Sequence, residues 1–236
     1  MRRFVLALQL MTSLPLPPVK ADEKDFAAAI RWFPAAGVAV GGAAAAAMTL
    51  GSRVDPWAAA LFALLAWVAA TGALHLDGLG DIADGAGAAH GDRTKLSAVL
   101  ADPHIGSFGV VAIILQLLTK LVLLRLWAGM LPAWGLIPLA LIARIGPLAW
   151  TLWLPPLHEG LASRFRDGIR PAHLIAWSAL GLAFCSLLPA LAFAALLIPL
   201  WAWWLRSRIG GISGDGHGAG IEVIESALLA ALVLAR

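Results

Sequence analysis

The sequence predicts an all-α fold, a polytopic helical bundle that spans a membrane with about seven helices. Of its 236 residues, 61% are hydrophobic and 13% are charged, whereas a soluble domain carries about 45–50% apolar and about 25% charged residues. The apolar residues gather in runs of about 20, the length that an α-helix needs to cross the hydrocarbon core. We therefore expect residues 1–236 to form one integral membrane domain.

Seven segments are expected to cross the membrane. They lie at about residues 33–51, 57–76, 106–124, 131–153, 173–189, 190–205 and 221–235. Pro189 marks a turn or a kink between the fifth and the sixth segment. Residues 4–14 follow two arginines and imitate a signal peptide, but no small-x-small cleavage site follows them. We expect them to form a short helix in or near the membrane interface.

The basic residues are divided unequally between the two sides of the membrane. With seven crossings, the long polar segments 1–32, 77–105, 154–172 and 206–220 all fall on the side of the N-terminus. That side carries 12 lysines and arginines, against 3 on the other side. The positive-inside rule therefore predicts a cytoplasmic N-terminus and cytoplasmic long loops.

Three aspartates follow the second crossing, in the segment His75–Gly85 (HLDGLGDIADG). On a helix, Asp77, Asp81 and Asp84 fall within an arc of about 60°. Carboxylates so close together repel one another, and a divalent cation relieves that repulsion. Mg²⁺ typically takes one or two carboxylates together with phosphate oxygens of a substrate. We expect Gly78, Gly80, Gly85 and Gly87 to leave room for a bulky phosphate ester. The alternative is a solvated acidic loop beside the membrane.

A second cluster lies at residues 210–225 (GGISGDGHGAGIEVIE), where a glycine-rich loop is expected to enter the last crossing. Free backbone N–H groups there could hold an anion. Glu222 and Glu225 begin the apolar span, and carboxylates at membrane depth are candidates for function. The alternative is that both glutamates only favour a helix N-terminus.

Further polar residues accompany these clusters. Asp102 and Gly106 belong to another glycine loop that enters a crossing. Arg164 and Arg166, with Arg170, share a loop with His158 and Glu159; they either grip phosphates or serve only as topology signals. Within the crossings, Lys120 either snorkels to the interface or is functional, and Arg144 indicates function or an internal ion pair.

Together these motifs resemble the cobalamin synthase (adenosylcobinamide-GDP ribazoletransferase) family. The HLDGLGDIADG segment is similar to the signature of that family. Three further matches follow in the same order. Asp102 with Gly106 and Gly109 is similar to the DxxxGxxG loop of the family, and Glu159-Gly160 is similar to its EGL element. The stretch GGISGDGHGAGIEVIE is similar to its GGxTGDxxGAxxExxE. Near the N-terminus, a Leu-Pro-Leu-Pro run and Phe33-Pro34 with Gly37 and Gly41 also match. Ser13 and His104 stand where the family pattern has a basic residue, and Ser213 replaces a threonine.

The resemblance implies the last assembly step of the cobalamin nucleotide loop. In that step α-ribazole, or its 5′-phosphate, attacks adenosylcobinamide-GDP, and cobalamin or its phosphate forms while GMP leaves. It implies a Mg²⁺-dependent enzyme in a bacterial cytoplasmic membrane. Asp77, Asp81 and Asp84 would hold the metal ion, and Asp84, His75 or Asp81 would take the proton from the ribazole hydroxyl, with Asp84 slightly favoured. We expect the following residues to bind substrate or its phosphates: Arg164, Arg166, Asp102, Gly106, Asp215, Glu222 and Glu225.

Two other functions compete with this one. A CDP-alcohol phosphotransferase of lipid synthesis carries a related DxxDG pattern, but its longer signature continues differently from the residues that follow Gly85 here. A transporter should concentrate its polar residues near the bilayer midplane, whereas most of these gather at one face. The expected partners are the two substrates and membrane lipid, with no nucleic acid. A homo-oligomer and contacts with other nucleotide-loop enzymes remain open.

Overall fold

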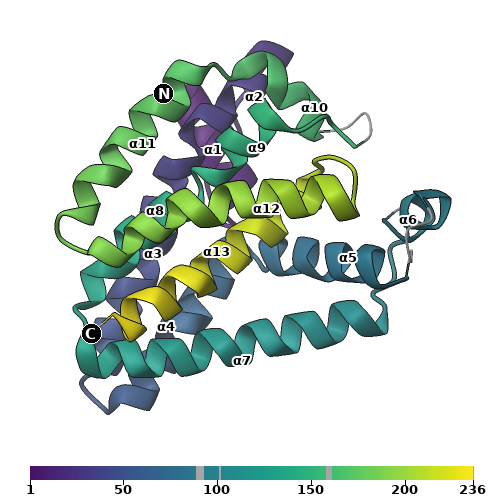
Figure 1. The fold of residues 1–236 in the computed structure, drawn as a ribbon. Helices are drawn as coiled ribbons and strands as arrows, with labels where there is room; N and C mark the ends of the chain where they lie inside the picture. Colours follow the sequence, from purple (N-terminus) through teal and green to yellow (C-terminus); the bar gives the residue numbers. More distant parts are fainter. Residues whose placement is uncertain (89–92, 101, 158–160, 236) are drawn as a thin grey trace.

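The structure is a computed structural model, and it describes residues 1–88, 93–100, 102–157 and 161–235. In these ranges the chain forms helices and no β-strand, which confirms the all-α prediction. Figure 1 shows long helices packed against one another as a bundle. The α-helices are α1 (Arg2–Met11), α2 (Glu23–Ala29), α3 (Phe33–Gly51), α4 (Pro56–Thr71), α5 (Leu74–Ala88), α6 (Arg93–Leu100), α7 (Ser107–Met130), α8 (Leu136–Ala143), α9 (Gly146–Trp153), α10 (Leu161–Phe165), α11 (Pro171–Cys185), α12 (Ala194–Arg208) and α13 (Gly214–Leu234). Four 3₁₀ turns are interposed: η1 (Ile30–Trp32), η2 (Ala133–Gly135), η3 (Arg166–Gly168) and η4 (Pro189–Phe193).

Five helical segments in the described chain are long and apolar enough to cross a membrane. They are Glu23–Gly51, Ser107–Met130, Ala133–Trp153, Pro189–Arg208 and Gly214–Leu234. Helices α4 and α5 pass the same test only as a pair and give a sixth candidate. Helix α11 is apolar, but it has only 15 residues. The chain is therefore a multi-pass membrane protein, and the predicted crossing at α11 stays a prediction.

The second crossing, predicted at residues 57–76, ends earlier in the structure than predicted. Helix α4 ends at Thr71 because Gly72 and Ala73 take left-handed backbone angles, with φ of 60° and 59°. The chain then turns by 83° into α5. An apolar run gives no sign of this break, since Ala73 and Leu74 continue it. The break places the three aspartates on a helix of their own.

The last crossing begins seven residues earlier than predicted. Ser213 caps helix α13, and its hydroxyl accepts a hydrogen bond of 3.0 Å from the backbone N–H of Gly216. The expectation of a glycine-rich loop up to residue 220 is therefore wrong, because residues 214–220 are helical. Glu222 and Glu225 then lie well inside the helix, so the alternative that they serve its N-terminus is also wrong.

Glycines set the closest helix packing in the bundle. A Cβ atom at Gly37 of α3 would lie 2.5 Å from the carbonyl oxygen of Ala140 in α8, and one at Gly41 would lie 2.5 Å from that of Leu136. Small residues four apart let transmembrane backbones approach in this way. Helix α3 thus packs directly on α8, and it also contacts α4.

Helix α13 is the central element of the bundle. It contacts α5, α7, α8 and α12, and Figure 1 shows it crossing between α12 and α7. Most of its residues are buried. The short helix α1 confirms the helix expected at residues 4–14, with Leu6, Leu8 and Met11 among its buried side chains. These contacts bring the two polar clusters of the sequence, on α5 and α13, side by side.

Candidate active site

The aspartates of α5 gather with one from α13. Asp77 is exposed, Asp81 is half-buried and Asp84 is buried, and all three lie on one helix as predicted. Asp215, in the first turn of α13, joins them. The charges of Asp215, Asp77 and Asp84 all lie close enough to repel that of Asp81. The structure therefore adds Asp215, from the second predicted cluster, to the three aspartates of the first. Glu222 and Glu225 of the second cluster lie in a separate network with Lys120.

Close helix packing produces this meeting. A Cβ atom at Gly78 would lie 2.9 Å from both the Cα and the carbonyl oxygen of Asp215, and one at Gly218 would lie 3.2 Å from the Cα of His75. Helices α5 and α13 can touch at these points only because both positions are glycine. The sequence analysis expected Gly78 to leave room for a phosphate ester. This expectation is wrong, because the backbone of Asp215 occupies that space.

The other three glycines of the aspartate helix also face neighbouring side chains. Ideal Cβ atoms there would meet Ile105 and Ile113 at Gly80, Leu96 and Leu100 at Gly85, and Phe108 at Gly87. The expectation that these glycines open a space for substrate is therefore wrong. Their physical role in the structure is to admit helices α6 and α7 and the segment before α7.

Asp84 joins the aspartate helix to the start of α7. Its two carboxylate oxygens accept hydrogen bonds from the backbone N–H groups of Gly106, at 2.7 Å, and Gly109, at 2.9 Å. The N-terminus of a helix favours negative charge, and its first N–H groups need acceptors. A Cβ atom at either glycine would collide with the carboxylate. This contact explains the glycine spacing in the segment that begins at Asp102.

A cavity of about 170 Å³ lies where α1, α5 and α13 meet. Its polar lining comes from His75, Asp77, Asp215 and His217, and Leu10 is among the apolar residues that complete it. In the described chain, neither ring nitrogen of the buried His75 has a hydrogen-bond partner. Nδ1 of His217 also has none among the described residues. Buried polar atoms are nearly always paired. The cavity therefore presents polar groups that a bound molecule or water could satisfy.

Deeper in the bundle, charged residues form a buried network. Nζ of Lys120 donates to Glu222 at 2.7 Å and to Glu225 at 2.6 Å, and Nη1 of Arg144 donates to Glu225 at 2.7 Å. All four side chains are at most 3% exposed. Two cations thus balance two carboxylates inside the membrane protein. Lys120 does not snorkel, and Arg144 makes the internal ion pair that its position indicated.

His75 lies between the aspartate group and this network. It lines the cavity with Asp77, and the charges of Arg144, Glu225 and Lys120 also act on its ring. Glu222 and Glu225 are engaged by cations and do not line the cavity. Their predicted part in substrate or metal binding stays a prediction.

Sequence reasoning missed Gln116, which completes the network. Its side-chain amide lies 2.8 Å from a carboxylate oxygen and from the carbonyl oxygen of Glu222, and 2.8 Å from the hydroxyl of Ser226. Gln116 and Lys120 are four residues apart and therefore share one face of α7. Two polar residues at this spacing inside an apolar helix are the sequence signal from which Gln116 could have been predicted.

The other predicted binding residues lie elsewhere. Arg164 lines a separate cavity of about 530 Å³ with Arg3 and Arg31, and Arg166 donates to the carbonyl oxygen of Leu154 at 3.2 Å. Asp102 is exposed, and hydrogen bonds from the backbone and the ring of His104 hold the pKa of its carboxyl below the usual range. His158, Glu159 and Gly160 lie outside the described residues.

The four aspartates offer the oxygen ligands that a hard divalent cation prefers, although they are not already arranged as a metal site. Among the described residues, no three His, Cys, Asp or Glu side chains are grouped closely enough to hold a metal ion as they stand. Mg²⁺ does not need such a group, because it keeps water and phosphate oxygens as ligands. The repulsion around Asp81 is what such a cation would relieve.

Comparisons with known proteins identify the family. The model of the cobalamin-5-phosphate synthase family matches residues 3–233. A protein of Novosphingobium aromaticivorans named adenosylcobinamide-GDP ribazoletransferase is 53% identical, with 99% of this chain and 97% of the relative covered. Relatives of the same name from Thiobacillus denitrificans and Laribacter hongkongensis are 47% and 46% identical, each with 100% of this chain and 98% of the relative covered. No solved structure matches the chain. The chain belongs to the cobalamin-5-phosphate synthase family.

Proposed function

We propose that this protein is an adenosylcobinamide-GDP ribazoletransferase that acts in assembly of the cobalamin nucleotide loop. It transfers the adenosylcobinamide phosphoryl group from adenosylcobinamide-GDP to α-ribazole or its 5′-phosphate. The products are adenosylcobalamin or its 5′-phosphate, and GMP. The family match over residues 3–233 and the relatives of that name support this activity. They give no support to the CDP-alcohol phosphotransferase or the transporter.

One structural observation carries the assignment of the site. Four aspartates lie near one another where α5 and α13 cross, beside a cavity lined by two buried histidines. Transfer of a phosphoryl group depends mainly on positioning and on neutralisation of negative charge. Asp77, Asp81 and Asp215 would hold Mg²⁺, which when bound neutralises charge on the pyrophosphate and on the departing GMP. Asp84, whose two oxygens accept hydrogen bonds from backbone N–H groups at the start of α7, would add its negative charge without being a ligand.

In the reaction, a ribazole hydroxyl oxygen forms a bond to the phosphorus that carries the cobinamide. The bond from that phosphorus to the bridging oxygen breaks, and GMP leaves with the bridging oxygen. The hydroxyl proton must pass to a base within about 3 Å. We assign this role to His75, because it lines the cavity and neither of its ring nitrogens has a hydrogen-bond partner among the described residues.

Asp84 is a weaker candidate for the base than the sequence suggested. Each of its oxygens already accepts a hydrogen bond from a backbone N–H group, at Gly106 and at Gly109, and Asp84 does not line the cavity. We therefore propose Asp84 as a positioning residue that holds the start of α7 against the aspartate helix.

The placement in the membrane is also part of the proposal. With α11 counted as a crossing, the side of the N-terminus carries 12 basic residues against 3, and this excess supports a cytoplasmic N-terminus in a bacterial inner membrane. Asp77, Asp81 and Asp215 would then face the compartment that holds nucleotide substrates. A homo-oligomer and association with other nucleotide-loop enzymes stay open.

The test is a mass-spectrometric assay of the detergent-purified protein with adenosylcobinamide-GDP and α-ribazole phosphate. We expect GMP and cobalamin phosphate with Mg²⁺ and neither with EDTA. Asp81→Asn should lower the rate at least about a hundredfold, since even outer-shell partners of a metal contribute 10- to 100-fold. Asp55→Asn is the matched control, because Asp55 caps α4 and asparagine caps a helix equally well. No product from folded protein with any divalent metal would refute the activity, and full activity of folded Asp81→Asn would refute the metal site.

A further inference from the structure

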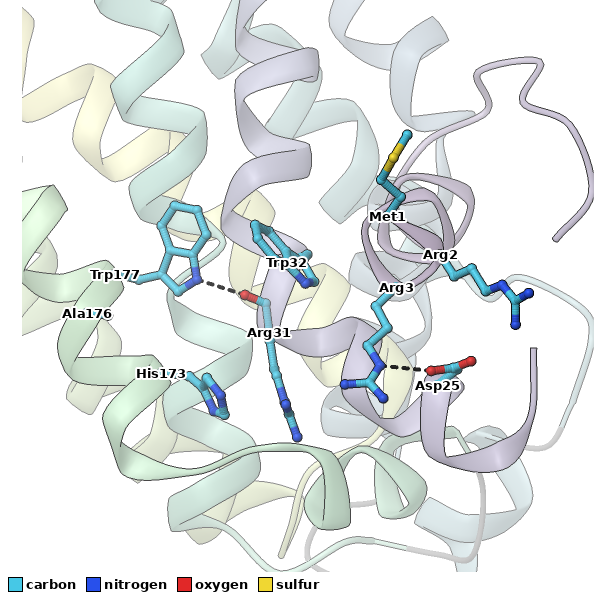
Figure 2. Close-up of a pocket in the computed structure, with 9 residues that line it drawn as sticks. All are labelled: Met1, Arg2, Arg3, Asp25, Arg31, Trp32, His173, Ala176 and Trp177. Atoms are coloured by element: carbon cyan, nitrogen blue, oxygen red, sulfur yellow. Dashed lines mark hydrogen bonds and ion pairs between the residues drawn. The ribbon is translucent and has the colours of Figure 1, made fainter. Parts of the chain in front are cut away.

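A third cavity, of about 600 Å³, lies at the N-terminal end of α1, and Figure 2 shows the residues that line it. Arg2 and Arg3 come to it from α1, Arg31 from η1 and His173 from the first turn of α11. Arg3 is separated from Leu10, which lines the aspartate cavity, by about 10 Å along the helix axis. The aspartate cavity and this one are therefore separate, whereas the 530 Å³ cavity beside Arg164 shares Arg3 and Arg31 with it. The proposed reaction does not use the 600 Å³ cavity.

The lining of this cavity has an excess of positive charge. Asp25 is its one carboxylate in the described chain, and it pairs with Arg3 at 2.8 Å. No described acidic side chain pairs with Arg2 or Arg31. The charges of Arg3 and Arg170 act on the Arg31 guanidinium, whose Nε–H donates to the carbonyl oxygen of Gly168. Figure 2 shows Arg3 and Arg31 extending in the same direction. An anion is the ligand that such a group of guanidiniums would bind.

Tryptophans form the other side of the cavity. Trp32 and Trp177 meet edge to face at 6.4 Å, and the indole N–H of Trp177 donates to the carbonyl oxygen of Arg31 at 2.7 Å. Trp32 remains 42% exposed. Tryptophan is enriched at the depth of lipid headgroups. From His173 onward, α11 continues away from the cavity as an apolar helix. Its Ile175 and Leu182 are 67% and 70% exposed, as expected of side chains that face acyl chains.

We propose that this cavity binds the phosphate headgroup of an anionic phospholipid of the surrounding membrane. Basic pockets between helices at the membrane surface bind such headgroups. Arg3 and Arg31, which extend in the same direction, supply the charge for the phosphate, while Trp32 and Trp177 lie against the glycerol region. The acyl chains follow the exposed apolar side of α11. A soluble phosphate ester would share the arginines but gain nothing from this apolar side.

The experiment measures the lipid retained by the full chain in detergent. The protein is exchanged into micelles with equal amounts of phosphatidylglycerol and phosphatidylcholine, purified again, and its bound lipids are quantified by mass spectrometry. Arg31→Gln and Arg3→Gln are compared with Arg208→Gln, which removes an exposed arginine outside this cavity. We expect a preference for phosphatidylglycerol that falls by about fivefold or more in the first two variants, as removal of a basic group at a membrane surface predicts, and persists in the third.

Equal retention of both lipids, or equal loss in all three variants, would overturn the proposal. A second arm adds inorganic phosphate or glycerol phosphate at millimolar concentration. Displacement of the lipid by either would show a site for soluble phosphate and would also overturn it. If Arg31→Gln fails to fold because the bond to Gly168 is lost, Arg3→Gln decides the result, since its exposed pair with Asp25 contributes little to stability. None of these measurements depends on the transferase activity.

Discussion

Arg144 and Glu225 form an ion pair of 2.7 Å between two side chains that are both fully buried. Arg144 lies between α8 and α9, and Glu225 lies in the middle of α13, 81 positions further along the chain. Glu225 also accepts a hydrogen bond from Lys120. The network therefore ties three membrane segments together, and each charge in it depends on its partners.

Removal of one member should destabilise the protein strongly. We expect Arg144→Met to lower the free energy of unfolding by about 3–5 kcal/mol, because it leaves a buried carboxylate short of a cation. The double variant Arg144→Met with Glu225→Gln should recover much of that loss, since Lys120 and Glu222 remain as a balanced pair. Equilibrium unfolding in detergent measures both.

Arg206→Met serves as the control, because Arg206 is exposed at the end of α12. A double variant no more stable than Arg144→Met alone would show that the arginine acts through packing and not through charge balance.

The carboxylate of Asp84 should hold the start of α7 in place. In Asp84→Asn one of the two oxygens is replaced by an amide group that donates, so Gly106 or Gly109 loses its acceptor. A buried N–H left unpaired costs about 1–3 kcal/mol. Hydrogen exchange should therefore quicken at residues 106–109 and the transfer rate should fall. An unchanged exchange rate there with a lost activity would instead point to a direct chemical role for Asp84.

Much of this site could be predicted from the local pattern of the chain. The spacing of Asp77, Asp81 and Asp84 shows one helical face without any tertiary information, because helix geometry alone fixes it. The apolar runs likewise located the membrane helices to within a few residues in most places. Composition and charge distribution act over short stretches, and the sequence displays them directly.

Pairings between distant segments could not be predicted in the same way. The meeting of Asp215 with Asp81 depends on how closely α5 and α13 approach, and the glycines that allow it resemble glycines of a loop. The break at Gly72 is hidden because Ala73, which also takes a left-handed conformation, is a residue that normally continues a helix. Lys120 was ambiguous because only the fold shows which carboxylates face it.

Close packing of the two site helices gives a third test. Gly78→Ala would place a methyl group 2.9 Å from the backbone of Asp215, whereas Gly42→Ala, inside α3, meets nothing within 4 Å. Overpacking of this kind costs about 1–3 kcal/mol. We expect Gly78→Ala to lower both the unfolding midpoint and the transfer rate, and Gly42→Ala to lower neither. Equal behaviour of the two variants would contradict the observed crossing of α5 and α13.

The proposed role of His75 makes the sharpest prediction about the chemistry. A positioned general base contributes about 10²–10⁴ to a rate, so His75→Gln should lower kcat by at least about a hundredfold. Because its ring has no partner among the described residues, the loss should come without a large change in the unfolding midpoint. The dependence on Mg²⁺ should persist, which separates this variant from Asp81→Asn. His104→Gln, an exposed histidine outside the cavity, is the control. A rise in KM with kcat unchanged would show that His75 only binds ribazole and that another group takes the proton.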